Sequence, residues 1–156
     1  VIESGRDWLY DPSKEGKMSE WIQGTGHVGL SVADLDESIQ FYEEVLGLTV
    51  STKREKDAFI QLGEADVLAL LQFPGGKEAF DEQARPRYRG KAFTHFGLRA
   101  PNVQAVFDFQ ARLQTAGVSI VKEAYERWDG ASFYFLDPNG HTLEYIYFDP
   151  TAEAPA

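Results

Sequence analysis

The segment His27-Val28-Gly29-Leu30-Ser31-Val32 returns later in the chain as His95-Phe96-Gly97-Leu98-Arg99-Ala100. Both copies begin with a histidine and continue into an apolar pattern with helical spacing. At the same offset the matched pairs are Leu35 with Val103, Ile39 with Phe107 and Phe41 with Phe109. Repetition at one fixed offset indicates a duplicated structural unit. We therefore expect two similar modules, each of which starts with a short strand that passes into a helix.

The helix of each module has a recognisable start, apolar face and end. Asp34, with Glu37 three residues later, resembles a capping box, and Gly47 is suited to the C-terminal cap. Helical spacing places four apolar residues of the first helix on one face, Leu35, Ile39, Tyr42 and Leu46. The second helix is expected to start near Pro101-Asn102 and to end at Gly117. Its expected apolar face consists of Val103, Val106, Phe107 and Leu113.

Three strand patterns follow each helix. They cover residues 48–50, 58–62 and 67–73 in the first module, and 118–121, 132–136 and 142–148 in the second. The turn Asp137-Pro138-Asn139-Gly140 separates two aromatic-rich runs and predicts a hairpin. A one-residue bulge in that turn pairs Tyr134 with Glu144. Each module thus has the order strand–helix–strand–strand–strand, which predicts an α+β protein built from two βαβββ units.

The chain is expected to form one domain from these two modules. Residues 22–73 make the first module, 92–148 the second, and 74–91 a polar connector between them. Residues 1–21 are expected to be an N-terminal arm or a cloning remnant, and residues 149–156 a tail. A module of about 50 residues has too small a core to be stable alone. The modules must therefore pack against each other or against those of a second chain.

Composition narrows the possible functions. The net charge of −10 repels phosphate backbones, so nucleic acid is not an expected partner. No apolar run approaches the roughly 20 residues of a membrane helix, and the N-terminus lacks a signal-peptide pattern. We therefore expect a cytoplasmic protein without a membrane partner. Because the chain has no cysteine, a transition-metal site would have to use imidazole and carboxylate groups.

The chain has three histidines, and each can be considered as a candidate metal ligand. His27 and His95 occupy the same position in the two modules, so they can approach each other if the modules pack as pseudo-symmetric partners. Glu144 lies in an apolar strand, where a carboxylate needs a partner, and two imidazoles with one carboxylate form a facial metal-binding triad. The alternative is two core histidines and a strand-edge glutamate. Strand alternation points His141 to the face opposite Glu144.

Taken together, these motifs resemble the vicinal oxygen chelate superfamily, which includes glyoxalase I, extradiol dioxygenases, fosfomycin-resistance enzymes and bleomycin-binding proteins. The resemblance covers residues 22–148 and rests on the pattern that starts at His27 and on the run Leu136-Asp137-Pro138-Asn139-Gly140-His141-x-Leu143-Glu144. It implies two βαβββ modules whose curved sheets pair as a barrel around a metal cavity. By resemblance, His27, His95 and Glu144 are the metal ligands. The modules of such proteins pair within one chain or are exchanged across a dimer.

The expected metal ligands and substrate-side residues can be compared with those of two members of the superfamily. Glyoxalase I takes a fourth protein ligand from the last strand of its first module, and Ala69, which cannot bind a metal, stands at that position here. Extradiol dioxygenases are similar in using three ligands, and Tyr134 matches a tyrosine that they place beside the substrate. Those enzymes also use further histidines for proton transfer, whereas here only His141 is spare.

Fosfomycin-resistance enzymes resemble the chain in the run from Ser132 to Pro138. Ser132 and Tyr134 match positions on the substrate side of their site, so both are candidate substrate-binding residues. Two positions differ from that group, because Gly29 replaces a hydroxyl residue and no arginine follows Glu144. A dianionic phosphonate needs several charge-assisted donors, so this substrate requires donors that the motif does not supply.

The expected function is a metal-dependent enzyme that chelates neighbouring oxygens of a small substrate, with Tyr134 as a catalytic residue. Fe²⁺ or Mn²⁺ is the expected metal, and Zn²⁺, Ni²⁺ or Co²⁺ would also suit the ligands. Dioxygenase chemistry is slightly favoured over a glyoxalase-like lyase or isomerase and over a fosfomycin-resistance-like transferase. A homodimer is expected. The alternative from another class is a metal-free protein that sequesters a drug, as bleomycin-binding proteins do.

Overall fold

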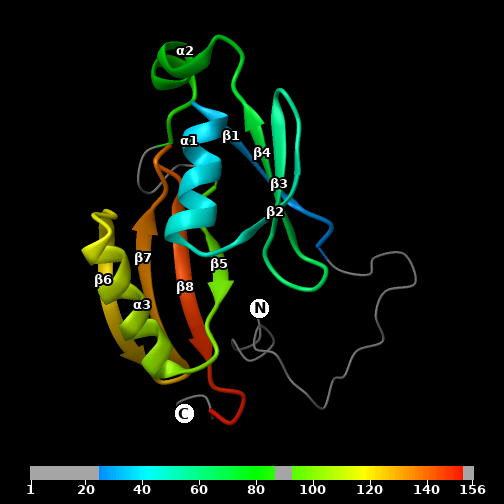
Figure 1. Cartoon of the computed structure of the whole chain (residues 1–156). Coiled ribbons are helices and arrows are strands. Elements are labelled where there is room, and N and C mark those ends of the chain that lie inside the picture. The colour runs from blue at the N-terminus through cyan, green and yellow to red at the C-terminus, as the bar shows by residue number, and fades with distance from the viewer. Residues whose placement is uncertain (1–24, 87–92, 153–156) are drawn as a thin grey trace, which may run out of the picture.

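The computed structural model describes residues 25–86 and 93–152, and Figure 1 shows two four-stranded sheets side by side. The first sheet has the order β1-β4-β3-β2 and consists of β1 (Val28–Val32), β2 (Thr49–Lys53), β3 (Asp57–Gln61) and β4 (Val67–Gln72). The second has the order β5-β8-β7-β6 and consists of β5 (Phe96–Arg99), β6 (Ile120–Arg127), β7 (Gly130–Leu136) and β8 (Thr142–Phe148). The second order repeats the first, so the prediction of two βαβββ modules is confirmed.

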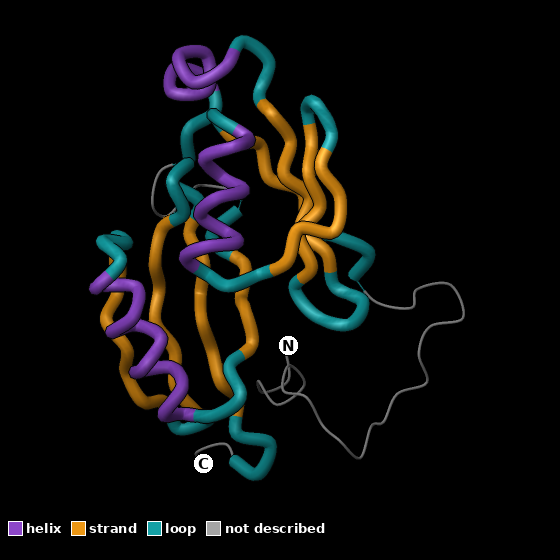
Figure 2. Tube along the Cα trace, in the orientation of Figure 1, coloured by secondary structure: helices purple, strands orange, loops and turns teal. Residues whose placement is uncertain are grey.

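Each module carries one helix between its first two strands, and a further short helix lies in the connector (Figure 2). The helical segments are α1 (Leu35–Gln40), the π-helical turn η2 (Phe41–Val45) that continues it, α2 (Gly76–Gln83) and α3 (Val103–Thr115). The Asp34 side chain caps α1 by accepting a hydrogen bond from the Glu37 N–H. The Asn102 side chain caps α3 in the same way. Both predicted helix starts are therefore confirmed.

The apolar face of α3 differs in one position from the expectation. Val106 and Leu113 are fully buried, but Phe107 is exposed to solvent. Phe109 instead faces the second sheet, where its ring packs against Phe133. The prediction that Phe107 belongs to the buried face was therefore wrong. Its counterpart at the repeat offset, Ile39, is buried, so the burial of the two helices differs at this position.

The connector is more ordered than its polar sequence indicated. It contains α2, whose only fully buried side chain is Phe80. The Phe80 ring packs edge-on against Phe73, with centroids 5.7 Å apart, and against His141. One buried aromatic ring thus anchors a helix that polar composition alone did not predict. Of the other segments expected from the sequence, the arm at residues 1–21 lies outside the described residues.

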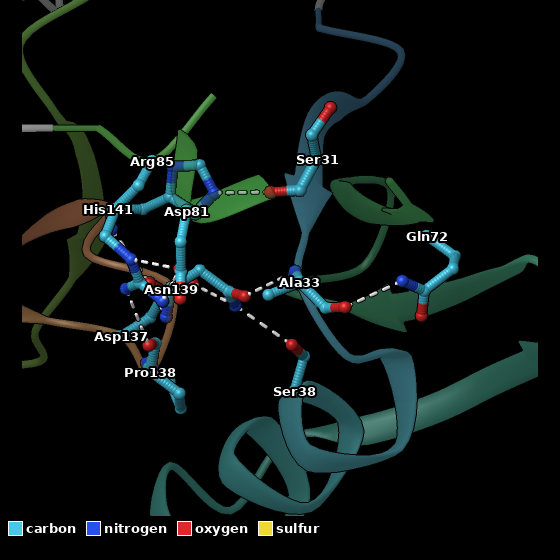
Figure 3. A network of polar contacts seen from close by, with 10 residues as sticks. All are labelled: Ser31, Ala33, Ser38, Gln72, Asp81, Arg85, Asp137, Pro138, Asn139 and His141. Carbon is cyan, nitrogen blue, oxygen red and sulfur yellow. Dashed lines mark hydrogen bonds and ion pairs between the residues drawn. The ribbon is translucent and has the colours of Figure 1, made fainter. Parts of the chain in front are cut away.

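The hairpin turn between β7 and β8 ties the two modules together (Figure 3). Asn139 is buried in this turn, and its side-chain oxygen accepts a hydrogen bond of 2.8 Å from the Ala33 N–H. The amide of the same side chain donates to Ser38 Oγ at 2.9 Å. A satisfied buried polar network favours one arrangement of the elements that it joins. The turn of the second module is therefore seated on the start of α1.

The strand registers agree with the sequence prediction. Tyr134 pairs with Glu144 across β7 and β8, as the bulged turn requires. In the parallel pairs, Gly29 lies opposite Ala69 in the first sheet and Gly97 lies opposite Glu144 in the second. Ala69 is therefore the structural counterpart of Glu144, as the strand alignment predicted. Within residues 25–86 and 93–152, no helix is both long enough and apolar enough to cross a membrane.

Candidate metal centre

His95 and Glu144 meet on the open face of the second sheet. His95 immediately precedes β5, and Glu144 lies on β8, the strand that runs parallel to β5. The distance between His95 Nε2 and Glu144 Oε2 is 3.2 Å. Two ligand atoms at right angles, each about 2.1 Å from one metal ion, are separated by roughly 3.0 Å. The pair therefore fits two neighbouring positions around a divalent metal.

The Glu144 carboxylate is buried, and one of its two oxygens makes no hydrogen bond to the described residues. Its side chain is 9% exposed, and Oε1 makes no hydrogen bond within the part of the chain that the structure describes. A buried carboxylate oxygen without a hydrogen bond costs free energy unless nearby positive charge compensates it, and a bound metal ion would be such a charge. Imidazole and carboxylate donors suit Fe²⁺, Mn²⁺ and similar ions. The residues present thus fit a divalent metal.

His27 does not join this pair within one chain. It lies exposed just before β1, in the first sheet. The described segments contain no group of three His, Cys, Asp or Glu side chains that could hold a metal. One chain therefore presents the candidate ligands as two sets, with His27 on the first sheet and the His95–Glu144 pair on the second.

Tyr134 forms a wall of the site. It lies opposite Glu144 in the strand register, and its ring stands edge-on to His95 with centroids 5.2 Å apart. Burial and, after it, the neighbouring Glu144 carboxylate raise the pKa of Tyr134 well above its ordinary value. The hydroxyl therefore stays protonated at neutral pH, where it can donate a hydrogen bond but cannot act as a base.

The same face carries a buried hydroxyl and a cation. Ser132 is fully buried, and its Oγ has no hydrogen-bond partner among the described residues. Bulges in β6 place Lys122 opposite Tyr134 and Tyr125 opposite Ser132, so these two β6 side chains share the face although they are three residues apart. Lys122 Nζ lies 3.6 Å from the Tyr125 ring centre. The face thus combines the His95–Glu144 pair with polar and cationic groups.

Sequence reasoning missed Arg127, which is the second cation of this face. Its Nη1 lies 3.8 Å from Glu144 Oε1. Its Nε and Nη2 donate to the Asp129 carboxylate at 2.7 and 2.8 Å, and this hydrogen bonding raises the pKa of Arg127. The Arg-x-Asp spacing before Gly130 was the only signal in the sequence. Its proximity to Glu144 was not evident from the sequence, because β7 lies between β6 and β8 and the contact depends on how all three strands pair.

His141 lies outside the site, on the opposite side of the sheet from Glu144. Its Nε2 is 2.8 Å from the carbonyl oxygen of Ser31, and its ring packs against Phe80. His141 therefore contacts Ser31 of the first module and Phe80 of the connector. Figure 3 shows the contact with Ser31. The prediction that alternation turns it away from Glu144 is confirmed. No third histidine remains near the His95–Glu144 pair for proton transfer.

A comparison with protein families agrees with this fold. The family described as "Glyoxalase/Bleomycin resistance protein/Dioxygenase superfamily" matches residues 24–145. The chain belongs to this superfamily, and the resemblance stated from the motifs is thereby confirmed.

Individual relatives include enzymes that act on different compounds. The chain is 34% identical over 126 residues to a glutathione transferase FosA of Serratia marcescens, and the match covers 79% of each protein. It is 31% identical over 124 residues to a metallothiol transferase FosB of Bacillus licheniformis, covering 79% of this chain and 74% of that one. A solved structure of lactoylglutathione lyase from Agrobacterium tumefaciens superposes with a TM-score of 0.63 at 20% identity, covering 86% and 100% of the two chains. That superposition shows a shared fold.

Proposed function

We propose that the protein is a metal-dependent enzyme whose metal is held by His95 and Glu144 of one chain and His27 of a second chain. The observation that carries this proposal is the His95–Glu144 pair, in which the carboxylate is buried and Nε2 and Oε2 lie 3.2 Å apart. A divalent metal bound there would act as a Lewis acid toward two neighbouring oxygens of a small substrate.

A second copy of the chain is the natural source of the missing histidine. The two sheets have equivalent strand orders and equivalent registers, so the first sheet of one copy can pair with the second sheet of another. Leu71 lies opposite Ser31 in the register and is 46% exposed, which leaves an apolar side chain uncovered on the open face of the first sheet. Such a face gains stability when another surface covers it. We therefore propose a homodimer with shared metal sites.

The site favours an anionic substrate. Lys122 lies opposite Tyr134 in the strand register, and Arg127 Nη1 lies 3.8 Å from Glu144 Oε1, on one face of a chain whose net charge is −10. Asp129 and Glu144 offset the charge of Arg127, whereas a divalent metal held by His95 and Glu144 would add positive charge that attracts small anions. The Tyr134 hydroxyl, which stays protonated, is placed to donate a hydrogen bond to a substrate oxygen. These groups supply donors that the sequence motif lacks after Glu144.

Among the reactions of the superfamily, we propose transfer of a thiol to a small oxyanionic substrate. In that reaction the thiol sulfur forms a bond to a substrate carbon, the bond from that carbon to oxygen breaks, and the thiol proton ends on that oxygen. The identity of 34% to a protein named glutathione transferase supports this choice. Dioxygenase chemistry, slightly favoured from the sequence, is less well supported because His141 is held by Ser31 and cannot supply the missing base.

Metal content tests the proposal directly. Protein purified without chelator should contain one divalent metal per chain, and both His95→Ala and Glu144→Ala should lose it. A protein without metal that also binds no added Mn²⁺ or Fe²⁺ would contradict the proposal and leave the drug-sequestering alternative. The reaction is tested with glutathione and fosfomycin by mass spectrometry of the adduct. Oxygen uptake with a catechol by the iron-loaded protein, without any adduct, would favour the dioxygenase instead.

Mixing two inactive variants tests whether the site is shared. His27→Ala and His95→Ala should each abolish metal binding when present alone. After the two are unfolded together and refolded, half of the dimers are mixed, and each mixed dimer has one intact site, so about a quarter of the wild-type metal binding should return. A site formed within one chain predicts that none returns.

A further inference from the structure

Glu144 presents its two carboxylate oxygens to different groups. Oε2 faces His95 Nε2 at 3.2 Å, whereas Oε1 faces Arg127 Nη1 at 3.8 Å. The side chain is 9% exposed, so protein neighbours rather than water set its orientation. Among the residues that the structure describes, none hydrogen-bonds to Oε1. The guanidinium is therefore the charge that determines where this oxygen points.

Arg127 is itself held in one orientation. Two parallel hydrogen bonds join its Nε and Nη2 to the Asp129 carboxylate, and Asp129 is buried. The guanidinium also lies over the Phe148 ring, 5.5 Å from its centre. A bidentate pair between a planar fork and a carboxylate permits little rotation. The contacts on one side of the guanidinium thus direct Nη1 toward Glu144.

We propose that Arg127 is a positioning residue that keeps Glu144 a one-oxygen metal ligand. Its charge stabilises negative charge on Oε1 and holds that oxygen away from His95, so that only Oε2 is offered to the metal. Carboxylates bind metals through one or two oxygens, and a one-oxygen ligand leaves a coordination position free. That position is needed when a substrate binds through two neighbouring oxygens. The inference rests on the proposed function, because it assumes a metal beside His95 and Glu144.

A matched control for Arg127 exists in the first sheet. Arg54 Nε lies 2.8 Å from Asp57 Oδ1, and its guanidinium lies 5.3 Å from the centre of the Phe59 ring. Arg54 thus makes the same kinds of contact as Arg127, with a carboxylate and an aromatic ring. The first sheet has Ala69 where the second has Glu144, so Arg54 has no candidate metal ligand to position.

The test uses the Co²⁺-loaded full-length protein, with Arg127→Gln, Arg127→Lys, Asp129→Asn and Arg54→Gln as variants. Three quantities are measured, namely the Kd for Co²⁺, the visible absorption of bound Co²⁺ and the Kd for acetohydroxamate, which binds metals through two oxygens. In Arg127→Gln we expect the Co²⁺ absorption to weaken, because a second Glu144 oxygen raises the coordination number. Acetohydroxamate should bind about tenfold more weakly, while the Kd for Co²⁺ changes by less than about threefold.

The other variants separate positioning from a general structural role. Asp129→Asn should shift the absorption in the same direction by less, Arg127→Lys should recover part of the wild-type behaviour, and Arg54→Gln should match the wild type. Thermal unfolding of the metal-free proteins shows which variants are folded. Unchanged absorption and acetohydroxamate affinity in folded Arg127→Gln overturns the inference alone. A wild-type protein that binds no Co²⁺ overturns the proposed function and the inference together.

Discussion

Tyr134 lies directly opposite Glu144 in the antiparallel ladder of β7 and β8. The phenol and the carboxylate therefore stand side by side on the open face of the second sheet, with His95 against the Tyr134 ring. Burial and the nearby carboxylate both disfavour a phenolate, which is why the pKa of Tyr134 is raised. A hydroxyl that keeps its proton beside a proposed metal ligand is suited to donate a hydrogen bond to a substrate oxygen.

Tyr134→Phe should lower kcat by about 100-fold and leave the metal content unchanged, because the ring is kept and only the donor is removed. Steady-state kinetics and metal analysis of the same preparation check both parts. Tyr145→Phe is the matched control, since Tyr145 lies on the other face of the sheet, against Phe109. Equal kcat values for the wild type and Tyr134→Phe would show that the tyrosine only forms part of the wall.

The register of this ladder could be predicted from the sequence because a short turn fixes it. The residues from Asp137 to Gly140 allow one tight turn, and every pair along β7 and β8 follows from it. The order of strands and helix in each module could be predicted in the same way, from the repeated sequence that begins at His27 and His95. Features set by a few neighbouring residues can therefore be predicted from the sequence.

The position of His27 and the role of Arg127 depend on long-range packing and could not be predicted. Whether His27 meets His95 depends on how the modules are arranged, and Asn139 seats the hairpin on α1 in a way that no local pattern encodes. Arg127 comes near Glu144 because it pairs with Gly130 at the end of β7, and β7 in turn pairs with β8. A contact that spans three strands depends on how the strands pair, so the alternation within one strand does not reveal it.

Ala69→Glu should create a fourth ligand at the position equivalent to Glu144. Ala69 is 3% exposed, so the new carboxylate would be buried and would destabilise the metal-free protein by a few kcal/mol, about 2–4. In the shared site it would lie near His27 and bind the metal, so added Mn²⁺ should restore the lost stability. Thermal unfolding with EDTA and with Mn²⁺ measures both effects.

Ala69→Gln provides the comparison for that variant, because it has a similar size but a much weaker metal ligand. It should be destabilised with or without Mn²⁺. Equal responses of Ala69→Glu and Ala69→Gln to Mn²⁺ would contradict the equivalence of Ala69 and Glu144 in a shared site.

Gly130→Ala should destabilise the protein by about 3 kcal/mol or prevent folding. Gly130 has φ of 140°, and a Cβ at this position would lie 1.9 Å from the Tyr147 carbonyl oxygen. The backbone of β7 would have to move away from β8, which would also disturb the neighbouring Asp129. Gly117→Ala is the control, since Gly117 has φ of 76° with open space around it and should cost only about 1 kcal/mol. Urea unfolding of both variants measures the difference, and similar losses would refute the steric argument.

Tyr42→Phe should change how stability depends on pH. The Tyr42 hydroxyl is fully buried and donates to Asp137 Oδ2 at 3.0 Å. Burial and, after it, the Asp137 carboxylate raise the pKa of Tyr42 well above its ordinary value of 10.0. Because the folded state then holds its proton more tightly than the unfolded state, the stabilising contribution is complete below pH 10 and is lost as the pH rises above it.

At neutral pH, Tyr42→Phe should lose about 1 kcal/mol of unfolding free energy, since one buried hydrogen bond disappears and Asp137 keeps its other donors. Above pH 10 the wild type should lose stability more steeply than the variant, so the two curves should converge. Urea unfolding at a series of pH values on both sides of 10 follows this convergence. Curves that stay parallel across that range would mean that Tyr42 ionises equally well in both states, and the buried bond to Asp137 would then not explain the attachment of the hairpin to α1.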